Sequence, residues 1–102
     1  MLTYESAIGI IQKSCQSLKE SGLVENPIVV QDGTVFLGSG SPLDSLAFVV
    51  FITDLEERLN REEQKEDLFL VLKDIHEFNA DNSSLTAGVL AKYLVNLTGG
   101  KV

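Results

Sequence analysis

Three places in the sequence hold side chains that could do chemistry: Cys15, His76 and the tripeptide Asp44-Ser45-Leu46. Cys15 stands between Ile11 and Leu18 on the apolar side of a predicted helix, which indicates a small core residue rather than a nucleophile. His76 has no constellation of Cys, His or carboxylate residues around it at metal-ligand spacing, so we expect neither a metal site nor a general base there. The sequence therefore predicts a protein that is not an enzyme.

The tripeptide stands at the start of a helical pattern, directly after a Gly/Ser-rich stretch over residues 38–42 that reads as a flexible loop. No Gly-Lys-Ser/Thr follows that stretch, so the Walker phosphate-binding motif is absent. Asp44 and Ser45 are both good helix-capping residues, and a cap is the simplest role for either of them. A chemical role for Ser45 therefore needs support from the rest of the chain.

The elements that would position these residues are mainly helices. Apolar side chains recur every three or four residues, which is the helical period, within residues 3–21, 44–60 and 85–97. Ser84 is a good N-cap for the last of these helices, and Gly88 inside it indicates close packing. The three apolar stripes consist of Tyr4, Ile8, Ile11, Cys15 and Leu18; of Phe48, Ile52, Leu55 and Leu59; and of Leu85, Val89, Leu90, Leu94 and Leu97.

Two shorter elements lie between these helices. Residues 28–37 contain two β-prone runs joined by Asp32-Gly33, a pattern that predicts a β-hairpin. Residues 73–78 form one or two helical turns. Together these elements predict an all-α fold: a four-helix bundle with a short third helix and a small β-hairpin inserted between helices one and two. We expect one domain over residues 1–102.

The composition limits the partners. The 102 residues carry 15 acidic and 8 basic side chains, and residues 44–81 hold 11 of the acidic and 4 of the basic ones. This surface repels phosphate backbones and anionic membranes, so we expect no nucleic-acid partner. No apolar run approaches the roughly 20 residues that span a bilayer, so we expect no membrane insertion. The single cysteine fits a reducing compartment, and we expect a cytoplasmic monomer.

The chain resembles an acyl carrier protein in four features taken together. These are its helical segments, the shorter one before the last, the net acidity, and Asp44-Ser45-Leu46 at the start of the second helix. The resemblance is tight over residues 41–60 and weaker at the first and last helices. It implies a bundle of acyl-carrier type, in which Ser45, flanked by Asp44 and Leu46, carries a 4′-phosphopantetheine arm. A phosphopantetheinyl transferase attaches this arm from coenzyme A in that family. The N-terminus of a helix favours the resulting phosphodiester, because its N–H groups and its dipole attract negative charge.

The resemblance also implies what the protein does. The arm holds an acyl or related group as a thioester and presents it to acyl-handling enzymes of fatty-acid, lipid or secondary-metabolite synthesis. These partners are of the acyl-activating ligase, ketosynthase or acyltransferase type. In the family the acyl chain can lie between helices, and the apolar residues to consider for such a pocket are Phe48, Ile52, Phe78, Val89 and Leu90. For most of these five we expect a plain core position instead.

The second helix is where partners dock in this family. Asp54, Glu56 and Glu57 match the acidic docking pattern. Ala47 and Val50 stand where carriers of primary fatty-acid synthesis usually have acidic residues, so we expect partners to contact an apolar patch there. This departure predicts a specialised carrier rather than a housekeeping one, with a fatty acyl, polyketide or aminoacyl cargo.

The alternative is a small acidic helical module that binds other proteins and has no prosthetic group. In that case Asp44-Ser45-Leu46 is only a helix cap, and Ser45 stays unmodified by a competent transferase.

Overall fold

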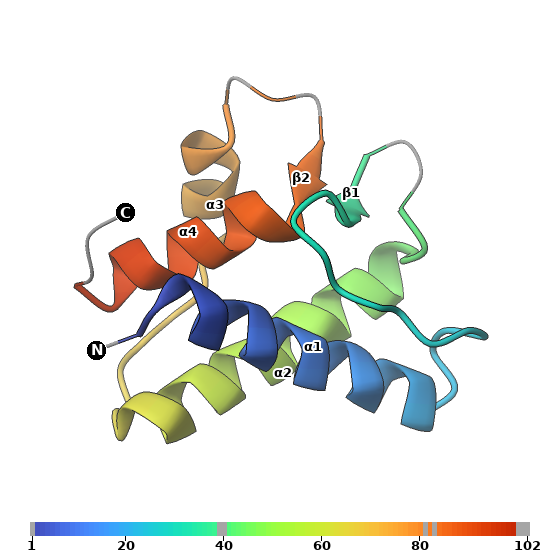
Figure 1. Ribbon diagram of the computed structural model, residues 1–102, viewed down its shortest axis with the longest axis horizontal. Coiled ribbons are helices and arrows are strands. Elements are labelled where there is room, and N and C mark those ends of the chain that lie inside the picture. Colours follow the sequence, from blue (N-terminus) through green and yellow to red (C-terminus); the bar gives the residue numbers. More distant parts are fainter. Residues whose placement is uncertain (1, 39–40, 81, 83, 100–102) are drawn as a thin grey trace.

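The computed structural model describes residues 2–38, 41–80, 82 and 84–99. Residues 1, 39–40, 81, 83 and 100–102 of the predicted domain lie outside the described residues, and two of them belong to the predicted Gly/Ser loop. The described elements are α1 (Tyr4–Glu20), β1 (Val35–Leu37), α2 (Ser45–Glu63), α3 (Leu72–Phe78), β2 (Leu85–Thr86) and α4 (Ala87–Leu97) (Figure 1). The prediction of a mainly helical fold with four helices is therefore confirmed.

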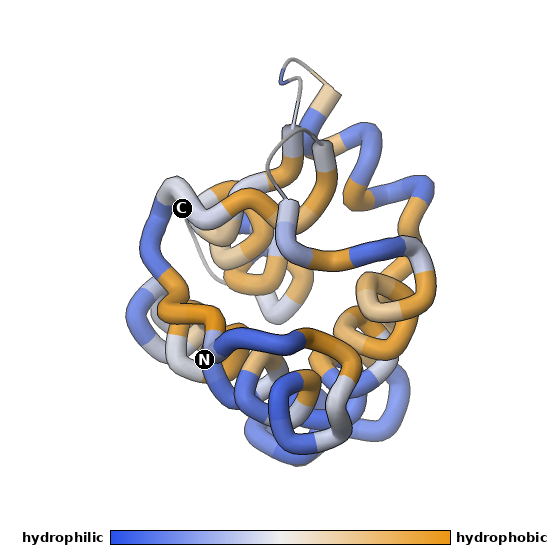
Figure 2. Tube along the Cα trace, turned by 90° about the vertical axis from the view of Figure 1, so that its right-hand side faces the viewer, coloured by the Kyte–Doolittle hydropathy of each residue, from blue (hydrophilic) through white to orange (hydrophobic). Residues whose placement is uncertain are grey.

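Helix α1 lies against both α2 and α4 (Figure 1). Thr3 begins it as the N-cap, and its side chain accepts a hydrogen bond from the backbone N–H of Ser6 at 3.1 Å. Its buried face includes Ile11, Cys15 and Leu18, which confirms most of the predicted stripe. Many apolar stretches of the chain lie toward the middle of the molecule, and hydrophilic ones lie along its outer edges, including the lower edge of the view (Figure 2). Burial of this face drives the packing of the three long helices.

Helix α2 buries its whole predicted stripe, Phe48, Ile52, Leu55 and Leu59. It continues to Glu63, three residues beyond the predicted end, and stops where Gln64 adopts a left-handed backbone conformation with φ of 55°. No helix of the described residues combines the length and the apolarity that a membrane span requires.

The sheet differs from the predicted hairpin over residues 28–37. β1 pairs antiparallel with β2, which lies directly before α4, and residues 28–31 form no strand. The predicted turn at Asp32-Gly33 is present, but the side chain of Gln12 binds the backbone in front of it. Gln12 Nε2 donates to the carbonyl of Ile28 at 2.7 Å, and its Oε1 accepts from the N–H of Val30 at 2.8 Å. These backbone groups are thus satisfied without a neighbouring strand.

The last two helices are close to their predicted bounds. α3 begins at Leu72, one residue earlier than expected, and α4 begins at Ala87 because the two residues before it belong to β2. The predicted N-cap Ser84 is therefore wrong. Thr86 caps α4 instead, and its hydroxyl accepts a hydrogen bond from the N–H of Val89 at 3.4 Å.

The start of α4 is in close contact with the turn that precedes β1. The N–H of Gly88 donates to the carbonyl of Asp32 at 2.9 Å, and the N–H of Ala87 donates to the carbonyl of Thr34 at 2.7 Å. The hydroxyl of Tyr4, at the start of α1, donates to the Asp32 carboxylate. The close packing predicted at Gly88 is confirmed, because a Cβ there would lie 3.1 Å from the carbonyl oxygen of Asp32 and 3.2 Å from the hydroxyl oxygen of Tyr4.

This contact predicts opposite effects for two helical glycines. Gly88→Ala is expected to lower the free energy of unfolding by about 1 kcal/mol, because the crowding against a backbone carbonyl outweighs the helix propensity gained. Gly9→Ala in α1 has nothing within 4 Å of the added Cβ. It is expected to raise the free energy of unfolding by up to about 1 kcal/mol. Urea unfolding of both variants measures the difference, and equal effects would contradict the contact at Gly88.

Candidate functional site

The start of α2 separates the roles of Asp44 and Ser45. Asp44 is the N-cap, and its Oδ1 accepts a hydrogen bond from the N–H of Ala47 at 2.7 Å. Ser45 is the first residue of the helix and is exposed. Among the described residues, no hydrogen bond engages its hydroxyl. The capping role therefore belongs to Asp44, and the Ser45 hydroxyl is left available at a helix N-terminus.

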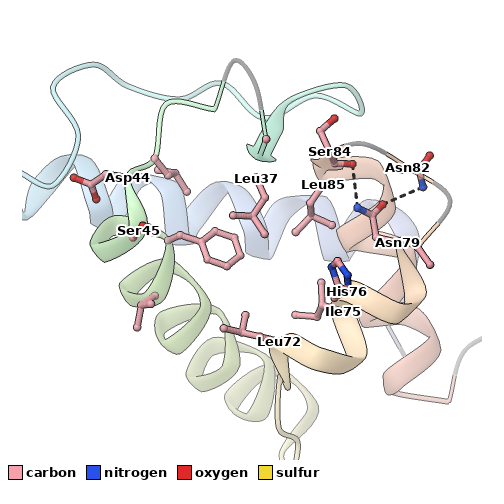
Figure 3. Close-up of a pocket in the computed structure, with 15 residues that line it drawn as sticks. Leu37, Asp44, Ser45, Leu72, Ile75, His76, Asn79, Asn82, Ser84 and Leu85 are labelled. Atoms are coloured by element: carbon pink, nitrogen blue, oxygen red, sulfur yellow. Dashed lines mark hydrogen bonds between the residues drawn. The ribbon is translucent and has the colours of Figure 1, made fainter.

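A cavity of about 510 Å³ opens beside Ser45. It lies between the first turns of α2, helix α3 and the two strands, and both Asp44 and Ser45 line it (Figure 3). Its size falls within the about 300–1,000 Å³ of small-molecule sites. The apolar part of its lining includes Leu37, Phe48, Leu72, Ile75 and Leu85.

Polar side chains line the side of the cavity opposite Ser45 (Figure 3). The Asn79 amide donates to the carbonyl of Ser84 at 3.0 Å, and the Asn82 amide donates to Asn79 Oδ1, also at 3.0 Å. His76 lies beside them on α3 and is exposed. Nothing in the sequence pattern indicated this group, because its members come from α3 and from the segment before β2.

The predicted pocket residues are only partly brought together. Phe48 lines the cavity, but Ile52, Phe78, Val89 and Leu90 do not. Ile52 and Leu90 are buried in the core, and Phe78 packs edge-on against Tyr93 with ring centroids 5.6 Å apart. Val89 and Leu90 do not line the cavity because α4 contributes no residue to its wall. The burial of Ile52 and Leu90 agrees with the expectation that most of the five are core residues.

The exposed apolar residues of α2 are also partly different from the ones predicted. Ala47 is completely buried, so its predicted role as a partner-contact residue is wrong: its position on the helix faces the core. Leu46, Val49 and Val50 are exposed, Leu46 by 64% and Val49 by 52%. We call these three residues the α2 apolar patch. Their spacing of three and four is a helical signal that could have identified Val49 from the sequence.

The three predicted docking carboxylates have different surroundings. Glu57 is exposed and pairs with Arg61 at 3.3 Å, while Asp54 is half-buried and pairs with Arg58 at 2.6 Å. Glu56 instead holds the segment that follows α2, since its Oε2 accepts a hydrogen bond from the N–H of Leu70 at 2.8 Å. Glu56 therefore has a structural role within the fold.

The different surroundings of Glu56 and Glu57 predict different effects of their substitution on stability. Glu56→Ala is expected to lower the free energy of unfolding by about 1–3 kcal/mol, because the N–H of Leu70 loses its partner in a half-buried setting. Glu57→Ala should change it by less than about 0.5 kcal/mol, as for most exposed side chains. Thermal and urea unfolding compare the two variants. A Glu56→Ala protein as stable as Glu57→Ala would show that Glu56 anchors nothing.

Cys15 and His76 do not form a shared site. Cys15 is completely buried in α1, and this burial raises the pKa of its thiol to about 12. His76 is exposed on α3 and lines the cavity, which Cys15 does not. Within the described part of the chain, no three His, Cys, Asp or Glu side chains gather in a group that could hold a metal ion. The prediction that Cys15 is a core residue is confirmed.

The raised pKa predicts an unreactive thiol in the native protein. At pH 8 the Cys15 thiol stays protonated and shielded, and only the thiolate reacts with disulfide reagents. We expect reaction with such a reagent to be at least about a hundredfold slower than in the chain unfolded in urea, because reaction requires the protein to open. Fast, complete labelling of the folded protein would contradict the burial of Cys15.

Comparison of the chain with protein-family models, with curated proteins and with solved structures gives no match.

Proposed function

We propose that the chain is an acyl carrier protein that is modified at Ser45. In this role a 4′-phosphopantetheine arm on Ser45 holds an acyl or related group as a thioester and presents it to partner enzymes. The observation that carries the proposal is the division of roles at the start of α2. Asp44 supplies the cap, so the exposed Ser45 hydroxyl has no structural task among the described residues.

The local chemistry suits attachment of the arm. Ser45 would use its oxygen to attack the phosphorus atom of coenzyme A nearest the pantetheine, and adenosine 3′,5′-bisphosphate would leave. The transferase would accept the proton from the hydroxyl. The new phosphodiester carries one negative charge at the N-terminus of α2, where backbone N–H groups and the helix dipole stabilise an anion. Asp44 has committed one carboxylate oxygen to the N–H of Ala47 at 2.7 Å, which keeps the first turn of the helix in place.

The cavity beside Ser45 supports the carrier function. The arm would start at the mouth of a partly apolar hollow lined by Phe48, Ile75 and Leu85, which the cargo at the end of the arm could enter. Burying an apolar chain there removes its surface from water, and each buried methylene contributes about 0.8 kcal/mol. A hollow at the attachment point has no such use in a protein whose tripeptide serves only as a cap.

The surface around Ser45 supports docking of partner enzymes. The α2 apolar patch begins at Leu46, directly after the proposed attachment residue, and Glu57 lies further along the same helix. An apolar patch next to exposed acidic groups suits an enzyme surface with an apolar centre and a basic rim. The partners proposed are a phosphopantetheinyl transferase and acyl-handling enzymes of the ligase, ketosynthase or acyltransferase type.

Transfer of the arm tests the proposal. With coenzyme A, Mg²⁺ and a broad-specificity phosphopantetheinyl transferase, the protein should gain the mass of one phosphopantetheine group. Ser45→Ala should gain none and should stay folded, with a change in stability under about 0.5 kcal/mol, because Asp44 remains as the cap. Thr53→Ala, which removes another hydroxyl from the same helix, should be modified like the unaltered protein.

A negative result would be equally informative. If a transferase active on a known carrier leaves the folded protein unmodified, the carrier function is wrong. The exposed patch on α2 would then favour the alternative, a small acidic module that binds other proteins and has no prosthetic group.

A further inference from the structure

We propose that the cargo carried on Ser45 ends in an uncharged hydrogen-bonding group, such as a hydroxyl, a ketone or an amide, and that His76 and Asn82 recognise this end in the cavity. The inference rests on the proposed carrier function and adds the chemical class of the cargo to it. A saturated hydrocarbon end and a carboxylate end are both disfavoured by the lining of the cavity.

The first argument is the order of the lining. Ser45 lies at one side of the cavity, Leu37 and Leu85 follow, and Asn79 and Asn82 lie at the opposite side (Figure 3). A cargo chain that lies in the cavity therefore contacts apolar side chains along its middle and polar ones at the side away from Ser45. This order matches a cargo with an apolar stem and a polar end.

The second argument is the state of the polar group. Asn79 is fixed by its hydrogen bond to the carbonyl of Ser84, and Asn82 is fixed by its bond to Asn79, each at 3.0 Å. These bonds use the amide nitrogen of each side chain and leave the carbonyl oxygen of Asn82 as an acceptor. The imidazole of His76, for which no hydrogen bond occurs within the described residues, adds a donor. The end of the cavity is thus able both to donate to a ligand and to accept from it.

The third argument is the charge of the lining. Among the described residues that line the cavity there is no lysine or arginine, and Asp44, at the Ser45 side, is the acidic one. A carboxylate at the far end of the cargo would give up part of its hydration and find no described lysine or arginine as a partner, which disfavours it. A hydrocarbon end would displace water from Asn82 and His76 and return no hydrogen bond. A neutral polar end replaces those water contacts directly.

The test compares three cargos of equal length on the full chain. The transferase loads Ser45 from octanoyl-, 8-hydroxyoctanoyl- and octanedioyl-coenzyme A, and intact mass follows hydrolysis of each thioester at mildly alkaline pH. Each rate is divided by that of the same thioester on free pantetheine, so that only protection by the protein remains. The hydroxylated cargo is expected to be protected about fivefold more than the octanoyl cargo, as one hydrogen bond to a neutral partner allows. The octanedioyl cargo is expected to be protected less than the octanoyl one.

Two variants identify the residues responsible. His76→Leu combined with Asn82→Leu should remove the advantage of the hydroxylated cargo and protect the octanoyl cargo at least as well as before. Glu77→Leu makes a similar polar-to-apolar change at an exposed residue of α3 that does not line the cavity, and it should leave the advantage in place. If the double variant fails to fold, the comparison of the three cargos on the unaltered protein still decides.

The outcomes separate the two proposals. If no cargo is loaded on Ser45 of the folded protein, the carrier function fails and the inference falls with it. If all three load and the octanoyl or octanedioyl form is protected as well as the hydroxylated one, the carrier function stands and the inference is wrong. Loss of the advantage in Glu77→Leu as well would also overturn the assignment to His76 and Asn82.

Discussion

The packing of α1 between α2 and α4 is the constraint on which the rest of the structure depends. Both long helices bury their apolar stripes against α1, which fixes them relative to one another. Helix α3 then packs against α4, and its Phe78 meets Tyr93 there. Because α3 packs against α4, the space between α3 and the first turns of α2 remains open. The cavity beside Ser45 is a consequence of this arrangement.

The strand pair fixes the other wall of the cavity and the approach to Ser45. β1 pairs with β2, which continues directly into α4, so the chain before α2 is attached to the helix core. After β1, the hydroxyl of Ser41 donates to the carbonyl of Phe36 at 2.8 Å and accepts from the N–H of Leu43 at 3.1 Å. These bonds satisfy backbone groups where no regular structure does so. They place the start of α2 at the mouth of the cavity.

The sequence predicts the helices well because their information is local. A stripe at every third or fourth residue reports directly on which face is buried, and the stripe of α2 from Phe48 to Leu59 is confirmed in full. The sheet could not be predicted in this way. Leu85 and Thr86 form a strand of two residues, which has no periodicity, and their partner lies about fifty residues earlier in the chain. The turn at Asp32-Gly33 formed as expected, but residues 28–31 before it form no strand, and the Gln12 side chain binds their backbone instead.

The candidate site, too, could be predicted from the sequence only in part. Asp44 and Ser45 are neighbours, and each is a residue type that caps helices, so sequence alone cannot assign the cap to one of them. The hydrogen bond from Ala47 to Asp44 decides it, and this bond depends on the backbone of Asp44 being extended before the helix begins. The same helix geometry turns Ala47 into the core and Leu46 and Val49 outward. One backbone transition therefore sets the cap, the exposure of Ser45 and the position of the α2 apolar patch. The proposed carrier function would use these three features together, because a residue that bears a cargo must lie where a partner docks.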